Sequence, residues 1–246
     1  MTDALYLADS YLEKCSAAVV ATGERSVVLD RTVFYPAGGG QPSDTGWLSA
    51  PDGRRWEVVS VAKSDGGIVH GVGSSDLPPV GTAVEAKIRW EARYQHMRYH
   101  TALHLLSGVV FHRFGSGITG GQIYVDRARM DFSLPEFNRE LAADLLGEMN
   151  RRSAEGIPVS ARTVTRSALD ADPSLVRVAR ELLPDVDPVR LIEIGTFDVQ
   201  ADGGTHVRST REVGTARVER IENKGARNKR LYISLDPPAP AIEGGP

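Results

Sequence analysis

The chain has 246 residues, of which 41% are hydrophobic and 25% are charged, with 25 glycines and 14 prolines. This composition is ordinary for a globular protein and argues against collagen-like, coiled-coil and intrinsically disordered chains. No run approaches the roughly 18 consecutive apolar residues of a membrane span, and the N-terminus lacks a basic and then apolar signal pattern. We therefore expect a cytoplasmic protein.

The charges are unevenly distributed, and the single cysteine limits the chemistry. The net charge of −3 resides in residues 1–90, with 8 Lys and Arg against 11 Asp and Glu, because residues 91–246 hold 21 of each. Cys15 has no partner for an internal disulfide, and no multi-cysteine metal cluster is available. A metal site would have to use histidines and carboxylates.

Residues 1–89 are predicted to form a small, closed or nearly closed β-barrel. Runs of β-branched residues alternate with turn sequences at residues 51–53 and 64–67. Short strands that are separated by turns at regular intervals are typical of such barrels. The expected strands are 17–21, 26–29, 32–35, 56–62 and 84–88.

Residues 90–236 are predicted to form an α+β domain that begins with a long helix at 90–114. Within that helix Met97, Leu103 and Leu106 recur at helical spacing and indicate a buried stripe. Ser133 and Glu136 have the spacing of a capping box and predict the start of a second helix. A third helix is expected between Asp172-Pro173 and Pro184, strands at 122–125, 127–132, 189–194, 215–223 and 230–235, and a disordered tail at 237–246.

Two pairs of metal-ligating residues stand far apart in the sequence. His100 and His104 are four residues apart on the long helix and therefore share a face, and Asp202 and His206 form a second pair in a glycine-containing turn. Three histidines and a carboxylate make an acceptable zinc site, although histidine pairs are also common as ordinary core or surface residues. The zinc metalloprotease motif is excluded, because Thr101 stands where that motif needs glutamate.

These motifs carry a resemblance to a known family. HTALH at residues 100–104 and DVQADGGTHV at 198–207, followed by RSTREVG and IENKGARNKRLYI, resemble the editing domain shared by alanyl-tRNA synthetase and the AlaX proteins. FYPAGGGQPSDTG at 34–46 resembles the glycine-rich motif of the longer AlaX class, in which a β-barrel precedes the editing domain. The resemblance covers residues 25–235. It implies an editing domain of the alanyl-/threonyl-tRNA synthetase type, which hydrolyses tRNA(Ala) mischarged with serine or, in some members, glycine.

The resemblance also implies a zinc ion at His100, His104, Asp202 and His206. The family usually has cysteine where this chain has Asp202, and an oxygen ligand weakens the preference for zinc. Three outcomes follow: Asp202 binds the metal directly, it supports a metal held by the three histidines, or the site binds metal poorly. Thr101 lies about 100° around the helix from His100, which favours an ordinary structural role.

Two further groups of residues are candidates for the substrate side of the site. Thr119 and Gln122 lie in a glycine-rich turn and are candidate catalytic residues that contact the aminoacyl group; the alternative is ordinary turn residues. The resemblance implies a substrate-binding loop that restricts the pocket, whereas glycine runs alone indicate a tight turn. That loop would comprise Gly38, Gly39, Gly40 and Asp44.

A basic segment completes the prediction. Residues 207–232 carry eight Lys and Arg against three Glu, which is typical either of a solvated surface or of a contact with a polyanion. Alternatives to the editing enzyme are a non-catalytic tRNA-binding module and a metallo-esterase for a different aminoacyl-tRNA. The expected tRNA-binding residues are Arg208, Arg211, Lys224, Arg227, Lys229 and Arg230.

Overall fold

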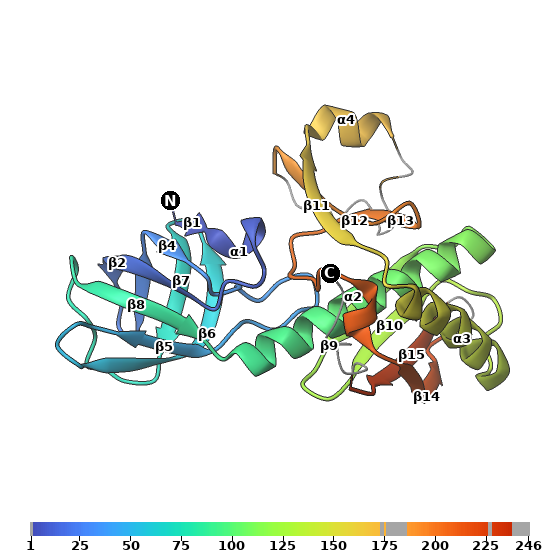
Figure 1. The fold of residues 1–246 in the computed structure, drawn as a ribbon, viewed down its shortest axis with the longest axis horizontal. Coiled ribbons are helices and arrows are strands. Elements are labelled where there is room, and N and C mark those ends of the chain that lie inside the picture. Colours follow the sequence, from blue (N-terminus) through green and yellow to red (C-terminus); the bar gives the residue numbers. More distant parts are fainter. Residues whose placement is uncertain (1, 173–174, 176–185, 226–227, 238–246) are drawn as a thin grey trace, which may run out of the picture. The chain divides into compact units, whose positions relative to one another are not determined.

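The computed structural model describes residues 2–172, 175, 186–225 and 228–237 and has two compact units, Met1–His96 and Met97–Pro246 (Figure 1). The predicted fold class is confirmed, because a closed β-barrel is followed by a unit of helices and two sheets. The predicted disordered tail lies, apart from Pro237, outside the described residues. Among the described residues, no helix combines the length and the apolar content that crossing a membrane requires.

The first unit is a six-stranded barrel whose strands follow the order β2-β3-β7-β6-β5-β8. In β7 and β8 every second residue is buried, as expected when one face of a strand lines a barrel core. Two short elements come before the first barrel strand in the chain, β1 (Asp3–Ala4) and the helix α1 (Leu5–Ala8). β4 (Arg31–Thr32) follows β3 and pairs in parallel with β1, outside the barrel sheet. The barrel strands are β2 (Lys14–Thr22), β3 (Ser26–Leu29), β5 (Gly46–Ser49), β6 (Arg55–Ser64), β7 (Gly67–Val72) and β8 (Ala83–Ile88).

The strand expected at 32–35 is wrong beyond Thr32. The backbone N–H of Phe34 donates to the Thr32 hydroxyl, and that of Tyr35 donates to the Asp44 carboxylate. These two N–H groups therefore bond side chains and do not pair with a neighbouring strand. The sequence also missed β5 and β7, which contain glycines that interrupt the β-branched pattern.

The second unit contains two antiparallel sheets, a four-stranded one in the order β14-β15-β10-β9 and a three-stranded one in the order β11-β12-β13. The strands are β9 (Ile118–Ile123), β10 (Ala128–Phe132), β11 (Val159–Val164), β12 (Val189–Ile194), β13 (Asp198–Ala201), β14 (Ala216–Asn223) and β15 (Lys229–Leu235). The helices are α2 (Trp90–Phe114), which starts in the first unit, α3 (Arg139–Glu155), α4 (Arg166–Ala171) and the short 3-10 helix η3 (Thr210–Val213).

The middle of the long helix α2 is buried on all sides, and not only along the predicted stripe. Residues 97–110 are all buried. Leu103 lies against Gly121 of β9, whereas Ser107 contacts Gln200 of β13, so the helix packs against both sheets (Figure 1). A helix that is covered all round can carry polar side chains only where the fold supplies them with partners. This arrangement places the histidines of α2 in the interior.

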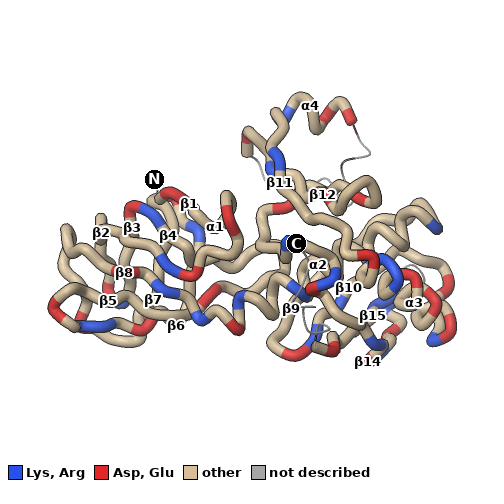
Figure 2. Tube along the Cα trace, viewed as in Figure 1, with Lys and Arg blue, Asp and Glu red and all other residues tan. Residues whose placement is uncertain are grey.

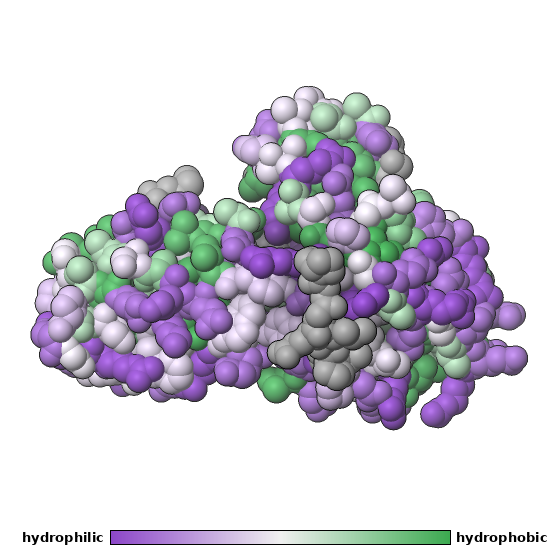
Figure 3. All heavy atoms as spheres, in the orientation of Figure 1, coloured by the Kyte–Doolittle hydropathy of each residue, from purple (hydrophilic) through white to green (hydrophobic). Residues whose placement is uncertain are grey.

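The start of α3 was predicted too early. The helix begins at Arg139, and the Asn138 side chain caps it by accepting from the Leu141 N–H at 2.8 Å. Leu134 and Phe137 are buried in the preceding non-helical segment, which overrides the local capping-box pattern at Ser133. The surface over α3 is mostly hydrophilic (Figure 3). Residues 173–184, predicted to be helical, lie outside the described residues except Leu175.

Candidate metal centre

Two elements bring the predicted metal ligands together. His100 and His104 lie one turn apart on α2, and their ring centroids are 5.1 Å apart. Asp202 directly follows β13, and His206 comes four residues later. Because β13 pairs with β12, the loop that starts at Asp202 leaves the sheet at a fixed position.

Arg190 of β12 fixes the course of this loop. Its carbonyl accepts from the Asp202 N–H at 3.1 Å, and its guanidinium Nη1 donates to the carbonyls of Asp202 at 3.2 Å and Gly204 at 2.8 Å. Three hydrogen bonds from one residue hold the backbone on either side of Gly203. The Asp202 side chain also holds the loop, because its Oδ2 accepts a hydrogen bond from the Gly204 N–H.

Gly204 allows the loop to approach the helix closely. A Cβ atom at this position would lie 2.2 Å from Cε1 of His100 and 2.4 Å from its Nδ1. Real Cβ atoms essentially never come so near to another heavy atom. Glycine is thus required here because the backbone packs directly on the imidazole ring.

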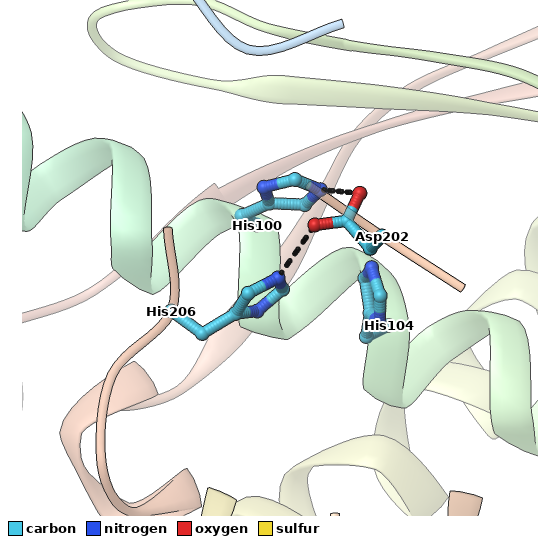
Figure 4. Close-up of side chains that lie close together, drawn as sticks. All are labelled: His100, His104, Asp202 and His206. Atoms are coloured by element: carbon cyan, nitrogen blue, oxygen red, sulfur yellow. Dashed lines mark hydrogen bonds and ion pairs between the residues drawn. The ribbon is translucent and has the colours of Figure 1, made fainter. Parts of the chain in front are cut away.

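The four side chains converge on a common point. One potential ligand atom from each of His100, His104, Asp202 and His206 lies within 4.8 Å of the other three. Figure 4 shows the three imidazole rings around the Asp202 carboxylate. Its Oδ2 is 3.1 Å from Nε2 of His206, and its Oδ1 is 3.5 Å from Nε2 of His100. The predicted ligand set is brought together by segments about a hundred residues apart.

The protonation states of the candidate ligands favour the binding of a cation. Burial lowers the pKa of His104 to about 4, and burial together with the neighbouring His100 holds the pKa of His206 well below its usual range. Burial alone would raise the pKa of Asp202, but His100 and the hydrogen bond from His206 outweigh it and hold that pKa well below its usual range. At neutral pH His104 and His206 are neutral and Asp202 is ionised, and these are the forms that bind metals.

The donor set fits a divalent metal ion. Three imidazoles and one carboxylate match the ligands that zinc takes in proteins, and the oxygen also tolerates harder ions. Nδ1 of His104 is buried and has no hydrogen-bond partner within the part of the chain that the structure describes. These four residues could therefore hold a metal ion.

Thr119 and Gln122 lie on β9, the strand that packs against α2 through Gly121. Thr119 is exposed and sits at an irregularity of the ladder, where β9 has one residue more than β10. Gln122 is half-buried, and its Nε2 donates to the Ile123 carbonyl at 3.2 Å. Thr119 therefore lies in a strand and not in the predicted turn, whereas Gln122, which was also expected to begin a strand, lies in one.

The glycine-rich segment forms a tight turn. Gly39 and Gly40 both have positive φ, 57° and 78°, between Gly38 and Gln41, which exchange two backbone hydrogen bonds. Left-handed geometry at both central positions explains the glycines. Asp44 is buried and bonds Arg93 and the backbone of Tyr35. The tight turn considered from the sequence is thus present, and the partners of Asp44 lie within its own unit.

The residues of the basic segment differ in how far their side chains are exposed. Arg208, Arg211 and Lys224 are exposed, and Lys224 pairs with Glu222 at 2.7 Å. Figure 2 shows basic and acidic residues interspersed around β14 and β15. Arg227 lies outside the described residues. The remaining two residues make contacts within the chain. Lys229 is buried and its Nζ donates to the Gly225 carbonyl, and Nε of Arg230 donates to the Asp131 carboxylate.

Sequence reasoning missed two residues that shape the centre. Arg190 orders the loop after β13, and Thr101, for which an ordinary structural role was favoured, bonds directly to His206 at 3.1 Å. No motif signals either contact. The position of Thr101 between two candidate ligands was the sole hint in the sequence.

Comparisons with known proteins match both units. A family model described as "Threonyl and Alanyl tRNA synthetase second additional domain" matches residues 189–232, which contain Asp202 and His206. A second model, described as "tRNA synthetases class II (A)", matches residues 5–92. Each unit is therefore similar to a part of aminoacyl-tRNA synthetases.

Proteins named "Alanyl-tRNA editing protein AlaX-M" are similar over nearly the whole chain. One from Methanosarcina acetivorans is 40% identical over 243 residues, which cover 96% of this chain and 99% of the relative. One from Saccharolobus solfataricus is 36% identical and covers 96% and 100%. An alanine–tRNA ligase from Pyrococcus furiosus is 35% identical over 90% of this chain but only 24% of the ligase.

Proposed function

The chain belongs to the family of AlaX-M alanyl-tRNA editing proteins, and on this premise we propose that it is a metal-dependent aminoacyl-tRNA deacylase. Its substrate is tRNA(Ala) mischarged with serine, or with glycine, and it acts in the cytoplasm. One observation carries the proposal. Three buried imidazoles and one partly buried carboxylate each offer a ligand atom, and these four atoms all lie within 4.8 Å of one another. Zinc centres that bind a further ligand typically have three protein ligands, so with Asp202 as a fourth the ion would have to become five-coordinate to take water or substrate.

The residues of the centre would divide the work as follows. His100, His104, Asp202 and His206 hold the ion, with Asp202 as a direct ligand because its oxygens face two of the rings. When bound, a divalent ion supplies positive charge that polarises an ester carbonyl or lowers the pKa of water. The chain itself excludes bulk water, since all three histidines are buried.

Other residues would recognise the two ends of the substrate. In the proposal, Thr119 and Gln122 of β9 contact the aminoacyl group, because β9 packs against the helix that carries His100 and His104. Gly38, Gly39 and Gly40 limit the amino-acid side chains that are accepted, and Asp44 acts indirectly by ordering their segment. For the tRNA phosphates we propose the exposed Arg208, Arg211 and Lys224, with Arg227, Lys229 and Arg230 as further members of the basic segment.

The test is deacylation of Ser-tRNA(Ala) and Gly-tRNA(Ala) by purified protein. Activity is expected to disappear with a chelator and to return with zinc. His104→Ala should lower kcat/KM by about 100-fold or more, because it removes a ligand. His112→Ala is the matched control, since His112 is an exposed histidine on the same helix that bonds only the Phe197 carbonyl among its described hydrogen-bond contacts. Its kcat/KM should stay within about twofold of the wild type.

Three outcomes would contradict parts of the proposal. Deacylation that survives both the chelator and His104→Ala rules out the metal mechanism. Binding of tRNA without hydrolysis favours a non-catalytic tRNA-binding module. Faster hydrolysis of another aminoacyl-tRNA than of Ser-tRNA(Ala) identifies a different ester as the substrate.

A further inference from the structure

Thr101 occupies a position that links the two halves of the candidate metal centre. It lies on α2 directly after His100, its side chain is completely buried, and it faces the returning chain at His206 and Val207. Its Oγ1 is 3.1 Å from Nδ1 of His206 and 3.3 Å from the backbone N of Val207. One hydroxyl therefore joins the helix with one ligand pair to the loop with the other.

The chemistry of the hydroxyl defines what it does for His206. The Val207 N–H can only donate, so Oγ1 accepts there and keeps one lone pair and its own hydrogen for the ring. Toward Nδ1 of His206 the hydroxyl can then either donate or accept. The same ring presents Nε2 to the Asp202 carboxylate at 3.1 Å, so Nε2, and not the Nδ1 that meets Thr101, faces the shared centre of the four donors.

The positions of Thr101 and Asp202 allow His206 to form hydrogen bonds in either of its neutral tautomers. Without an ion, Nε2–H donates to Asp202 and Nδ1 accepts from the Thr101 hydroxyl. When Nε2 is a ligand, it must offer its lone pair, so the hydrogen moves to Nδ1 and is donated to Oγ1. Valine has the same shape as threonine but would leave Nδ1 and the Val207 N–H buried without this partner.

We propose that Thr101 is a positioning residue that holds the His206 ring with Nε2 toward the metal centre and accommodates both of its tautomers. This inference rests on the proposed metal site and adds the residue that orients one ligand. Partners that bond the second nitrogen of a ligand histidine commonly change metal affinity by about 10- to 100-fold when they are removed.

The first test measures zinc affinity of the metal-free full chain in competition with a chromophoric chelator, without tRNA. Thr101→Val should bind zinc about 10- to 100-fold more weakly than the wild type. Thr101→Ser keeps the hydroxyl and should stay within about twofold. Ser107→Ala, which removes another buried hydroxyl from α2, should also stay within about twofold. Wild-type affinity in Thr101→Val overturns the proposal, as does an equal loss in Ser107→Ala.

The second test uses the wild type, so it holds even when Thr101→Val does not fold. Nitrogen-proton correlation spectra of the imidazoles should show His206 as the Nε2–H tautomer without zinc and as the Nδ1–H tautomer with zinc. Zinc on Nδ1 of His206, or an Nδ1–H ring in the metal-free protein, overturns the proposal. If the wild type binds no zinc, the metal-dependent function fails, while the metal-free spectrum still decides the role of Thr101.

Discussion

Asp44 in the barrel unit and Asp202 in the second unit both lie among basic side chains, but the two aspartates have opposite surroundings. In the barrel unit, Asp44 faces the guanidinium of Arg93, and the two side chains are 1% and 0% exposed. Arg93 Nε lies 3.0 Å from both carboxylate oxygens, and its other nitrogens donate to the carbonyls of Ser10 and Val33. In the second unit, Asp202 faces three imidazoles.

We call Asp44 and Arg93 the closed pair, because the charge of the aspartate is balanced by a permanent cation of the chain. We call Asp202 and its three imidazoles the open cluster, because this group has no permanent cation. Arginine carries a permanent positive charge, so Asp44 is neutralised within the chain and its hydrogen-bonding capacity is used. Burial holds the rings of His104 and His206 neutral, so their lone pairs and the Asp202 carboxylate are available together. A buried carboxylate thus stabilises the fold when its partner is a fixed cation and can recruit a cation when its partners are imidazoles.

Breaking the closed pair should have the largest effect. Asp44→Asn keeps the size of the side chain but leaves the Arg93 charge buried without a counter-ion, which should lower the free energy of unfolding by about 3–5 kcal/mol. Urea unfolding measures this change. The matched control is Arg54→Met, which breaks the exposed pair of Arg54 and Asp52 and should change the same quantity by less than about 0.5 kcal/mol. Equal effects of both variants would show that burial does not distinguish the pairs.

Neutralising the open cluster should act on metal affinity instead. Asp202→Asn removes the ionised donor and should weaken zinc binding by about 100-fold, or roughly 2.7 kcal/mol. Competition with a chelator measures the affinity, and unfolding in excess chelator should change less than it does in Asp44→Asn. An affinity within about twofold of the wild type would mean that Asp202 is not a ligand. Asp202→Cys should increase the preference for zinc over manganese, because a thiolate is the softer donor.

The approach of the loop to α2 gives the smallest expected effect. Gly204→Ala places a Cβ against the His100 ring and should weaken zinc binding by about tenfold, or roughly 1.4 kcal/mol, because the ring or the loop must shift. Gly203→Ala is the matched control, since nothing lies within 4 Å of a Cβ at that position. The same chelator competition measures both. If the two alanines weaken binding equally, loop flexibility and not close packing explains the glycines.

Local patterns predicted those strands whose bounds are marked by nearby turn residues, even where the pairing strands are far away in the sequence. The strands at 26–29 and 84–88 were found because their β-branched residues lie between clear turns, and β3 and β8 have almost the same bounds. The start of α3 was missed because burial of Leu134 and Phe137 is a tertiary effect that outweighs a capping box. Likewise, the full burial of α2 depends on two sheets that follow it in the chain.

The candidate centre shows the same limit. The four potential ligands could be chosen from spacing and resemblance, since each pair is local in sequence. The contact of Thr101 with His206 joins residues 105 positions apart and has no local signal. The internal partners of Lys229 and Arg230 were also hidden, because the composition of a basic segment does not say which side chains turn inward.

The chain distance between the two ligand pairs has a topological consequence. His104 and Asp202 are 98 positions apart, so an ion held by both pairs acts as a cross-link that closes most of the second unit into one loop. A cross-link that persisted in the unfolded chain would restrict a loop of about 100 residues by as much as about 4.7 kcal/mol in the chain-entropy description used for disulfides. An ion that is released on unfolding stabilises the fold instead by an amount that grows with its concentration relative to its dissociation constant. Metal supply would then set the lifetime of the folded protein as well as its catalytic competence.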